Sequence, residues 1–207
     1  MLRILGRPSS INVRKATWLC DELGLEFEQE AWGAGHRSTF EPAFTALNPN
    51  ALVPVLVDGD FVLWESNTIC RYLAAREGRT DWLPVEPQPR AQIEQWMDWQ
   101  AGELNNAWRH AFLGLVRKFP AYLDPVAIEA SVASWIKFMQ VLDGQLQRTG
   151  AYVTGTTITT ADIGIGLAVH RWFSTPIERP ALTGVEQYYA RLKERPAFLR
   201  HGANGEP

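Results

Sequence analysis

Apolar and polar positions alternate along the first part of the chain in a way that predicts four elements. Residues 2–5 form an apolar run that is expected to be a strand. From Asn12 the apolar positions recur at helical spacing, and Gly24 stands where a helix C-cap belongs. Residues 25–31 alternate apolar and mostly acidic side chains, as a half-buried strand does. A glycine-rich loop and a short helix at about residues 40–47 are expected to follow.

The pattern from Val53 to Asn67 predicts a strand, a tight hairpin, a second strand and the start of a helix. Pro54 lacks an N–H group, yet strongly strand-forming residues surround it. A proline at the first position of a strand can take a cis bond, which is rare in general. We expect a cis bond between Val53 and Pro54, because it would turn the neighbouring backbone outward, free to pair with a peptide-like ligand. Residues 58–60 (Asp-Gly-Asp) then close the hairpin.

Glu65 and Ser66 begin the helix that follows this hairpin. A helix start offers free N–H groups, which suit a ligand carboxylate, and the side chain of Glu65 suits a ligand ammonium. The pair therefore fits the amino-acid end of a ligand. The alternative from the local residues is a proline-initiated hairpin followed by an ordinary capped helix.

The second half of the chain has a helical pattern throughout. Pro84, Pro87 and Pro89 predict a linker, and a long helical stretch is expected from about Arg90 to Lys118. Two helix starts are marked by their capping residues, namely Asp124-Pro125, which opens a helix continuing to Leu146, and Thr159-Thr160-Ala161-Asp162. We interpret Asp162 as a structural residue that stabilises a helix start.

Composition narrows the class of protein. The hydrophobic share of 46% and the nine tryptophans favour a packed protein over a disordered one. The net charge of −3 provides no basic surface for nucleic acid, and no apolar run reaches the length of a membrane span. Cys20 and Cys70 do not form a Cys-x-x-Cys pair, so we interpret them as reduced, buried side chains of a cytoplasmic protein. Residues 201–207 are polar and are expected to be loose.

The order strand-helix-strand, helix, strand-strand-helix is the thioredoxin-like arrangement, and with these motifs it resembles the N-terminal domain of a cytosolic glutathione transferase. The capping box at Thr159–Asp162 resembles that of the family's buried sixth helix, so the resemblance extends over nearly the whole chain. It implies an α+β thioredoxin-like domain at residues 1–78, a linker at 79–89 and an all-α helical-bundle domain at 90–207. The matching segments are residues 8–15, 48–50, 53–56 and 64–69.

The resemblance implies that a hydroxyl in the first strand-to-helix turn hydrogen-bonds the glutathione sulfur. Ser9 and Ser10 are the candidates, and two comparisons favour Ser10. Ser10 precedes Arg14 by four residues, as in insect serine-type enzymes, and precedes Asn12 by two, as in the Thr-x-Asn pair of some bacterial and fungal members. We therefore expect Ser10 and Asn12 to stabilise the thiolate. The structural alternative is that either residue only caps the helix.

The resemblance also implies a glutathione site. Its expected residues are Val53, Pro54, Glu65 and Ser66, with His36 and Arg37 as candidates for the glycine carboxylate. One departure stands out: many members carry Lys or His in the Asn-Pro-x-x-x-Val-Pro segment, whereas this chain has Ala51-Leu52. The glycine end must then be recognised by other residues, or held less tightly.

For the second substrate, the resemblance implies a pocket for a small apolar electrophile. Trp108, Arg109 and Phe112 on the long helix are the expected lining, with Trp32 and Trp172 as further candidates. The alternative is that these aromatic residues belong to the core.

The resulting hypothesis is a dimeric, cytoplasmic, serine-type glutathione transferase of bacterial-like character. The glutathione thiolate would attack an electrophilic carbon, as in detoxification, or reduce a peroxide. We expect a homodimer that contacts through the third and fourth helical segments, no metal, and neither nucleic acid nor membrane as partner. Three alternatives stay open: an isomerase of the maleylacetoacetate type, a dehalogenase, and a non-catalytic interaction protein on the same fold.

Overall fold

The computed structural model describes all residues from 1 to 207. Contacts divide the chain into two compact units: residues 1–85 together with 196–206, and residues 86–195 together with Pro207. The sequence placed residues 90–207 in one domain, whereas here residues 196–206 pack with the N-terminal unit. Each unit is described by itself.

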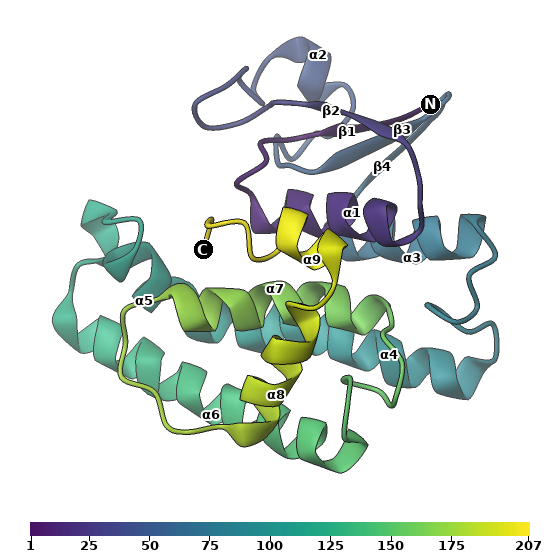
Figure 1. The fold of residues 1–207 in the computed structure, drawn as a ribbon. Helices are drawn as coiled ribbons and strands as arrows, with labels where there is room; N and C mark the ends of the chain where they lie inside the picture. Colours follow the sequence, from purple (N-terminus) through teal and green to yellow (C-terminus); the bar gives the residue numbers. More distant parts are fainter. The chain divides into compact units, whose positions relative to one another are not determined.

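The first unit is built on a four-stranded mixed sheet in the order β2-β1-β3-β4 (Figure 1). The strands are β1 (Leu2–Leu5), β2 (Phe27–Glu30), β3 (Val55–Asp58) and β4 (Phe61–Trp64). β1 pairs parallel with β2 and antiparallel with β3, and β3 and β4 form the expected hairpin. This is the thioredoxin-like arrangement expected from the sequence, although β2 is shorter than the predicted strand.

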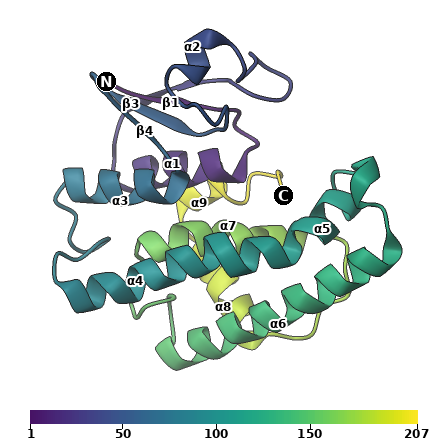
Figure 2. The ribbon, with the colours of Figure 1, turned by 180° about the vertical axis from the view of Figure 1, so that it is seen from behind.

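Helices cover both faces of this sheet. The short helix α2 (Pro42–Thr45) lies on one face, and α1 (Ile11–Glu22) and α3 (Ser66–Arg76) lie on the other (Figures 1 and 2). The period-2 alternation of the strands supplies apolar side chains to both faces. On the α2 face the buried cluster is Leu5, Trp32, Phe44, Val55 and Val57.

A last helix, α9 (Pro196–His201), packs on α1. The ring of Phe198 lies 4.9 Å from that of Trp18, and both side chains are fully buried. The expectation of a loose tail from residue 201 is therefore wrong, because His201 ends this helix and the following residues are hydrogen-bonded to α1. These residues are ordered by packing against α1, which is distant in the sequence, and the polarity of the local sequence does not indicate such packing.

The second unit begins with one long helical run in three parts: α4 (Pro87–Trp99), a π-helical turn η1 (Gln100–Leu104) and α5 (Asn105–Leu115). The sequence predicted a single helix from Arg90 to Lys118. The run instead starts at Pro87 and ends at Leu115, and Pro87 and Pro89 belong to its first turn. Proline is tolerated there because the first N–H groups of a helix have no partner within the helix.

The remaining helices are the 3₁₀ turn η2 (Pro120–Tyr122), α6 (Pro125–Thr149), α7 (Thr160–Ser174) and α8 (Thr183–Leu192). Both predicted caps are present. The side chain of Asp124 accepts a hydrogen bond from the Val126 amide, and Thr159 and Asp162 form the capping box of α7.

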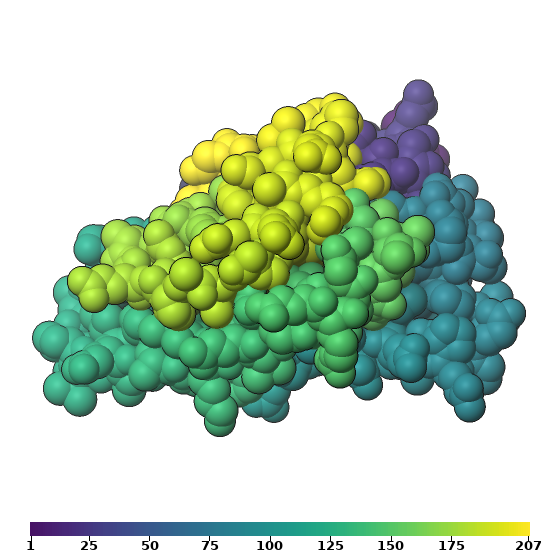
Figure 3. Space-filling view, turned by 60° about the horizontal axis from the view of Figure 1, so that its bottom comes forward, coloured from purple at the N-terminus to yellow at the C-terminus, as the bar shows by residue number.

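Within the second unit, α8 packs against α6. A Cβ atom at Gly184 would lie 2.9 Å from the Asp143 carbonyl oxygen, so the backbones approach closely there. Figure 3 shows the yellow-green residues of α8 directly against α6. None of the helices combines the length with the apolar character that a membrane-spanning helix requires.

Candidate functional site

The turn after β1 brings the start of α1 next to the loop before β3. Gly6 lies between these two segments with φ of +152°. A Cβ atom there would lie 2.4 Å from Cγ2 of Val13 and 3.0 Å from Cβ of Val53. Only glycine fits this position without displacement, and its absence of a side chain allows the two segments to meet.

Ser10 is the N-cap residue of α1, and its hydroxyl does not cap the helix. Its backbone is extended, and its side chain forms no hydrogen bond with the first-turn amides. The carbonyl of Ser10 accepts from the Arg14 amide at 2.9 Å, so the helix starts regularly. The side chain of Ser10 therefore does not cap the helix, contrary to the structural alternative for this residue. The hydroxyl remains available at a helix N-terminus.

The loop before β3 is organised by a buried asparagine. The Asn48 side chain donates to the Leu52 carbonyl at 2.8 Å, and its Oδ1 accepts from the Asn50 amide at 3.0 Å. The Val53–Pro54 bond is cis, as expected from the sequence. No turn or loop backbone hydrogen bond engages the amide or carbonyl of Val53.

Glu65 and Ser66 form the corner between β4 and α3. Glu65 is exposed and has φ of +73°, a conformation that costs a residue with a side chain about 1–3 kcal/mol. Such strain persists where the surroundings fix the backbone, and it often marks ligand-binding positions. Ser66 is buried, and its hydroxyl donates to Oδ1 of Asn12 on α1 at 3.4 Å. The starts of α1 and α3 are thus joined.

These segments enclose a cavity of about 120 Å³. Five of the residues predicted from the sequence lie together in its wall: Asn12, Val53, Pro54, Glu65 and Ser66. Ser10 is not part of this wall, but it begins the helix that carries Asn12. The remaining lining residues are Asn48, Asn50 and Leu52.

Asn48 and Asn50 were not predicted as site residues. The sequence signal for both residues is the Asn-Pro-Asn segment that begins five residues before Val53-Pro54. The Asn50 side chain is exposed and directs one amide hydrogen to Oδ1 of Asn48 at 3.0 Å. The second hydrogen of this side-chain amide is a potential donor to a ligand. No residue that lines the cavity carries a positive charge.

His36 and Arg37 are not in the cavity wall. Both are exposed in the loop after β2, and Arg37 contacts Glu41 at 3.1 Å. Its guanidinium also stacks 3.8 Å from the centre of the Trp32 ring. The predicted role of these two residues at the glycine end therefore stays a prediction.

The aromatic residues predicted for the second substrate lie mainly inside the helical unit. Trp108 and Phe112 are buried with their rings 5.5 Å apart, and the buried guanidinium of Arg171 stacks on both. Trp172 is also buried, whereas Arg109 is exposed. These contacts are those of a core, and the role of Trp108, Arg109 and Phe112 in binding an electrophile stays a prediction.

The two cysteine thiols of the chain are buried and unreactive. Cys20 and Cys70 are free and buried, and burial raises the pKa of each thiol to about 12. Both are therefore protonated at neutral pH and cannot serve as thiolate nucleophiles. No group of three or more His, Cys, Asp or Glu side chains has an arrangement that could hold a metal ion.

The cavity wall thus combines one carboxylate, several amide groups, a hydroxyl and the N-terminus of α3. Helix N-terminal N–H groups attract a carboxylate, and the Glu65 side chain attracts an ammonium. An unengaged backbone amide and carbonyl at Val53 can pair with an extended peptide. The arrangement suits a small peptide with a free amino-acid end.

Known proteins resemble this chain along most of its length. Residues 1–75 match the family described as the glutathione S-transferase N-terminal domain. The glutathione S-transferase GstB of Escherichia coli is 36% identical over 202 residues, which cover 97% of each chain. The glutathione S-transferase 3 of Zea mays is 32% identical over 208 residues, covering 96% of this chain and 92% of the relative.

A solved structure agrees with these relatives. The theta class glutathione S-transferase of Xanthomonas axonopodis pv. citri, determined with glutathione bound, superposes with a TM-score of 0.91 and 38% identity over 97% of this chain and 96% of its own. The similarity in sequence and the similarity in fold therefore both extend over the two units. The chain belongs to the glutathione S-transferase family of transferase enzymes, in its cytosolic-type form.

Proposed function

We propose that this chain binds glutathione in the cavity between α1, the loop of residues 46–54 before β3 (the Val53 loop) and α3, and that it activates the glutathione thiol. The observation that carries the proposal is the meeting of Asn12, Val53, Glu65 and Ser66 in one wall. A full-length relative at 38% identity, solved with glutathione bound, supports the choice of ligand. The enzyme would be of the serine type, acting on a small apolar electrophile or on a peroxide.

The groups of the tripeptide match the groups of the wall. The glutamyl ammonium would pair with Glu65. The glutamyl carboxylate would accept from the first N–H groups of α3 and from the Ser66 hydroxyl, which would exchange its present hydrogen bond to Asn12 for one to the ligand. The cysteinyl backbone would pair with the amide and carbonyl of Val53. This places the thiol toward the start of α1, where Ser10 and Asn12 lie.

The glycine carboxylate lacks the usual cation in this loop, because Ala51 and Leu52 occupy that region. The second amide hydrogen of Asn50 is the donor available in the cavity wall. His36 and Arg37 are the alternative, and they would have to leave their present surroundings. A neutral donor binds a carboxylate less strongly than a cation, so we expect glutathione to be held mainly by its glutamyl end.

The thiolate would be stabilised by the hydroxyl of Ser10, the amide of Asn12 and the N-terminal end of α1. A free cysteine thiol has a pKa of about 8.5, so a decrease of about two units corresponds to about 2.7 kcal/mol. Two hydrogen bonds and a helix N-terminus can provide this. The sulfur then forms a bond to an electrophilic carbon, and the leaving group departs with the bonding electrons. In the peroxide reaction, two glutathione molecules become a disulfide while the peroxide becomes an alcohol and water.

For the whole protein we propose a cytoplasmic homodimer. Two features support it. The edge strand β4 leaves the apolar side chains of Phe61 and Trp64 partly exposed, and both cysteines are unpaired, as is usual in a reducing compartment.

Calorimetric titration with glutathione tests the binding site. Glu65→Gln is expected to weaken binding about tenfold or more, because a hydrogen bond to a charged group contributes about 1.5–3 kcal/mol. Ser66→Ala is expected to weaken it further. Glu28→Gln, which changes an exposed carboxylate on β2, serves as the control and should bind like the unmodified protein. Unchanged affinity in the Glu65→Gln, Ser66→Ala double variant would place the ligand elsewhere and favour an interaction protein on this fold.

A further inference from the structure

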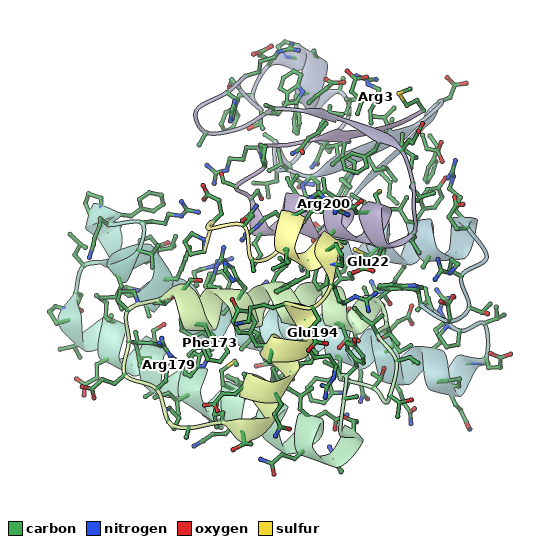
Figure 4. All side chains as sticks on the ribbon, viewed as in Figure 1. Arg3, Glu22, Phe173, Arg179, Glu194 and Arg200 are labelled. Carbon is green, nitrogen blue, oxygen red and sulfur yellow. The ribbon has the colours of Figure 1, made fainter.

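The C-terminal residues of the first unit run back along α1 toward its catalytic end. Three residues on one face of α1 contact them. Asp21 contacts Arg200 and His201, Trp18 packs on Phe198, and Arg14 receives the residues beyond α9. Figure 1 shows the yellow chain passing from α9 to the start of α1, and Figure 4 labels Arg200 on α9 beside α1.

The guanidinium of Arg14 contacts this returning chain through Nη1. Its Nη1 lies within hydrogen-bonding distance of the Gly202 carbonyl at 3.2 Å, Oδ1 of Asn204 at 3.3 Å and the Glu206 carbonyl at 2.7 Å. The side chain is only 1% exposed, although arginine is rarely buried. The sequence separation of about 190 residues makes this a tertiary feature rather than a local one.

The returning segment is itself ordered by internal hydrogen bonds. The amides of Gly202 and Ala203 both donate to the Phe198 carbonyl, at 2.6 and 2.9 Å, and turn the chain away from α9. A Cβ atom at Gly202 would lie 2.3 Å from the Phe198 ring, so this turn is tightly packed. Oδ1 of Asn204 also accepts from the Glu206 amide at 3.1 Å. Residues 202–206 are therefore shaped to present three acceptors to Arg14.

Arg14 links this segment to the turn that carries the catalytic groups. Its amide donates to the Ser10 carbonyl, which makes it the last residue of the first hydrogen-bonded turn of α1. The side chain of Asn12 lies within the same turn. Fixing Arg14 therefore limits the fraying of this turn, and fraying would misalign the N–H groups and side chains that face the sulfur.

We propose that residues 202–206 form a C-terminal clamp on the first turn of α1, and that Arg14 is the positioning residue through which the clamp aligns Ser10 and Asn12. This rests on the proposed function, because the aligned groups act on the glutathione thiol. The clamp would affect the ionisation of the thiol, while the glutamyl contacts at Glu65 and Ser66 would be left in place.

The test compares deletion of residues 203–207 with Arg14→Met, Arg14→Lys and Asn204→Ala. Each variant is titrated with glutathione bound, and kcat and the glutathione affinity are measured. We expect the deletion and Arg14→Met each to raise the pKa of the bound thiol by about one unit, with about a tenfold loss of kcat at neutral pH and recovery at higher pH. Glutathione affinity should change little. Asn204→Ala should have a smaller effect, and Arg14→Lys should restore part of the loss.

Several results would overturn the proposal. If the deletion leaves the thiol pKa and kcat unchanged while only the melting temperature falls, the segment is a structural tie. If Arg14→Met raises the pKa and the deletion does not, Arg14 acts by its charge and no clamp is needed. Combining deletion with Arg14→Met should add nothing, so additive losses would also contradict the proposal.

Arg200→Gln is the matched control, since it removes a contact of the same C-terminal region with α1, made by an exposed side chain near the far end of the helix. It should leave the thiol pKa unchanged. The proposed function itself fails separately, if the unmodified protein does not lower the pKa of bound glutathione at all.

Discussion

Gly6 is the residue on which the meeting of α1 and the Val53 loop depends. Replacing it by alanine adds a methyl group where Val13 and Val53 are already in contact range, and it forces a side chain into positive φ. We expect Gly6→Ala to lower the free energy of unfolding and to weaken glutathione binding. Denaturant unfolding and calorimetry would measure both effects.

Gly59 offers a matched control for this prediction. It also has positive φ, but a Cβ atom there would meet nothing within 4 Å. Gly59→Ala therefore reports the backbone cost alone, about 1–2 kcal/mol. Gly6→Ala should cost about 1–3 kcal/mol more, the usual effect of overpacking. Equal losses in the two variants would mean that crowding at Gly6 does not hold the site together.

Among the predicted site residues, the structure brings together mainly those that belong to contiguous motifs. Val53-Pro54 and Glu65-Ser66 each carry their chemistry within two adjacent positions, and the structure places them in one cavity wall. Asn50 was missed because its position in the wall depends on how Asn48 folds the loop. In the structure the charge of Arg37 is engaged by Glu41 and Trp32, contacts that no local pattern indicates, and its role at the glycine end stays a prediction.

At the scale of elements, helix starts were predicted better than helix continuations. The caps at Asp124 and Thr159 depend on side chains within three residues of the helix start, so the sequence contains them. The π-helical turn at Gln100–Leu104 and the docking of α9 depend on packing against distant segments. Local periodicity therefore predicted one uninterrupted helix and a loose tail.

The attachment of α9 to α1 is expected to weaken in acid. The hydrogen bond from Arg200 holds the pKa of Asp21 below its ordinary value of 3.8, and burial lowers the pKa of His201 below 6.5. Both groups bind protons less readily in the folded state. Their contribution to stability is therefore complete above the ordinary pKa and is lost as the pH falls through the folded-state value, first for His201 and then for Asp21.

Thermal unfolding measured from neutral pH to a pH of about 2 tests this prediction. The unmodified protein should lose more stability than the Asp21→Asn variant as the pH falls below about 4, and His201→Gln should remove the part lost near pH 6. Identical pH profiles in the three proteins would show that these two groups do not control the docking of α9.

At the scale of the whole molecule, the two units differ in what they contain. The first unit contains every element of the proposed glutathione site, and the second contains a buried aromatic core around Arg171. The relatives match over both units, which makes the family clear, but their names do not state the second substrate of this chain. The central claim is therefore activation of the thiol.

The ultraviolet absorbance of the thiolate, followed while the glutathione complex is titrated with base, tests this claim most directly. We expect a pKa for bound glutathione about two units below that of the free thiol. Ser10→Ala should raise this pKa and slow turnover at neutral pH, with recovery at higher pH and little change in glutathione affinity. Ser9→Ala should be milder. If bound glutathione in the unmodified protein titrates like free glutathione, the chain does not activate the thiol. A shift abolished only by Ser9→Ala would move the role to Ser9.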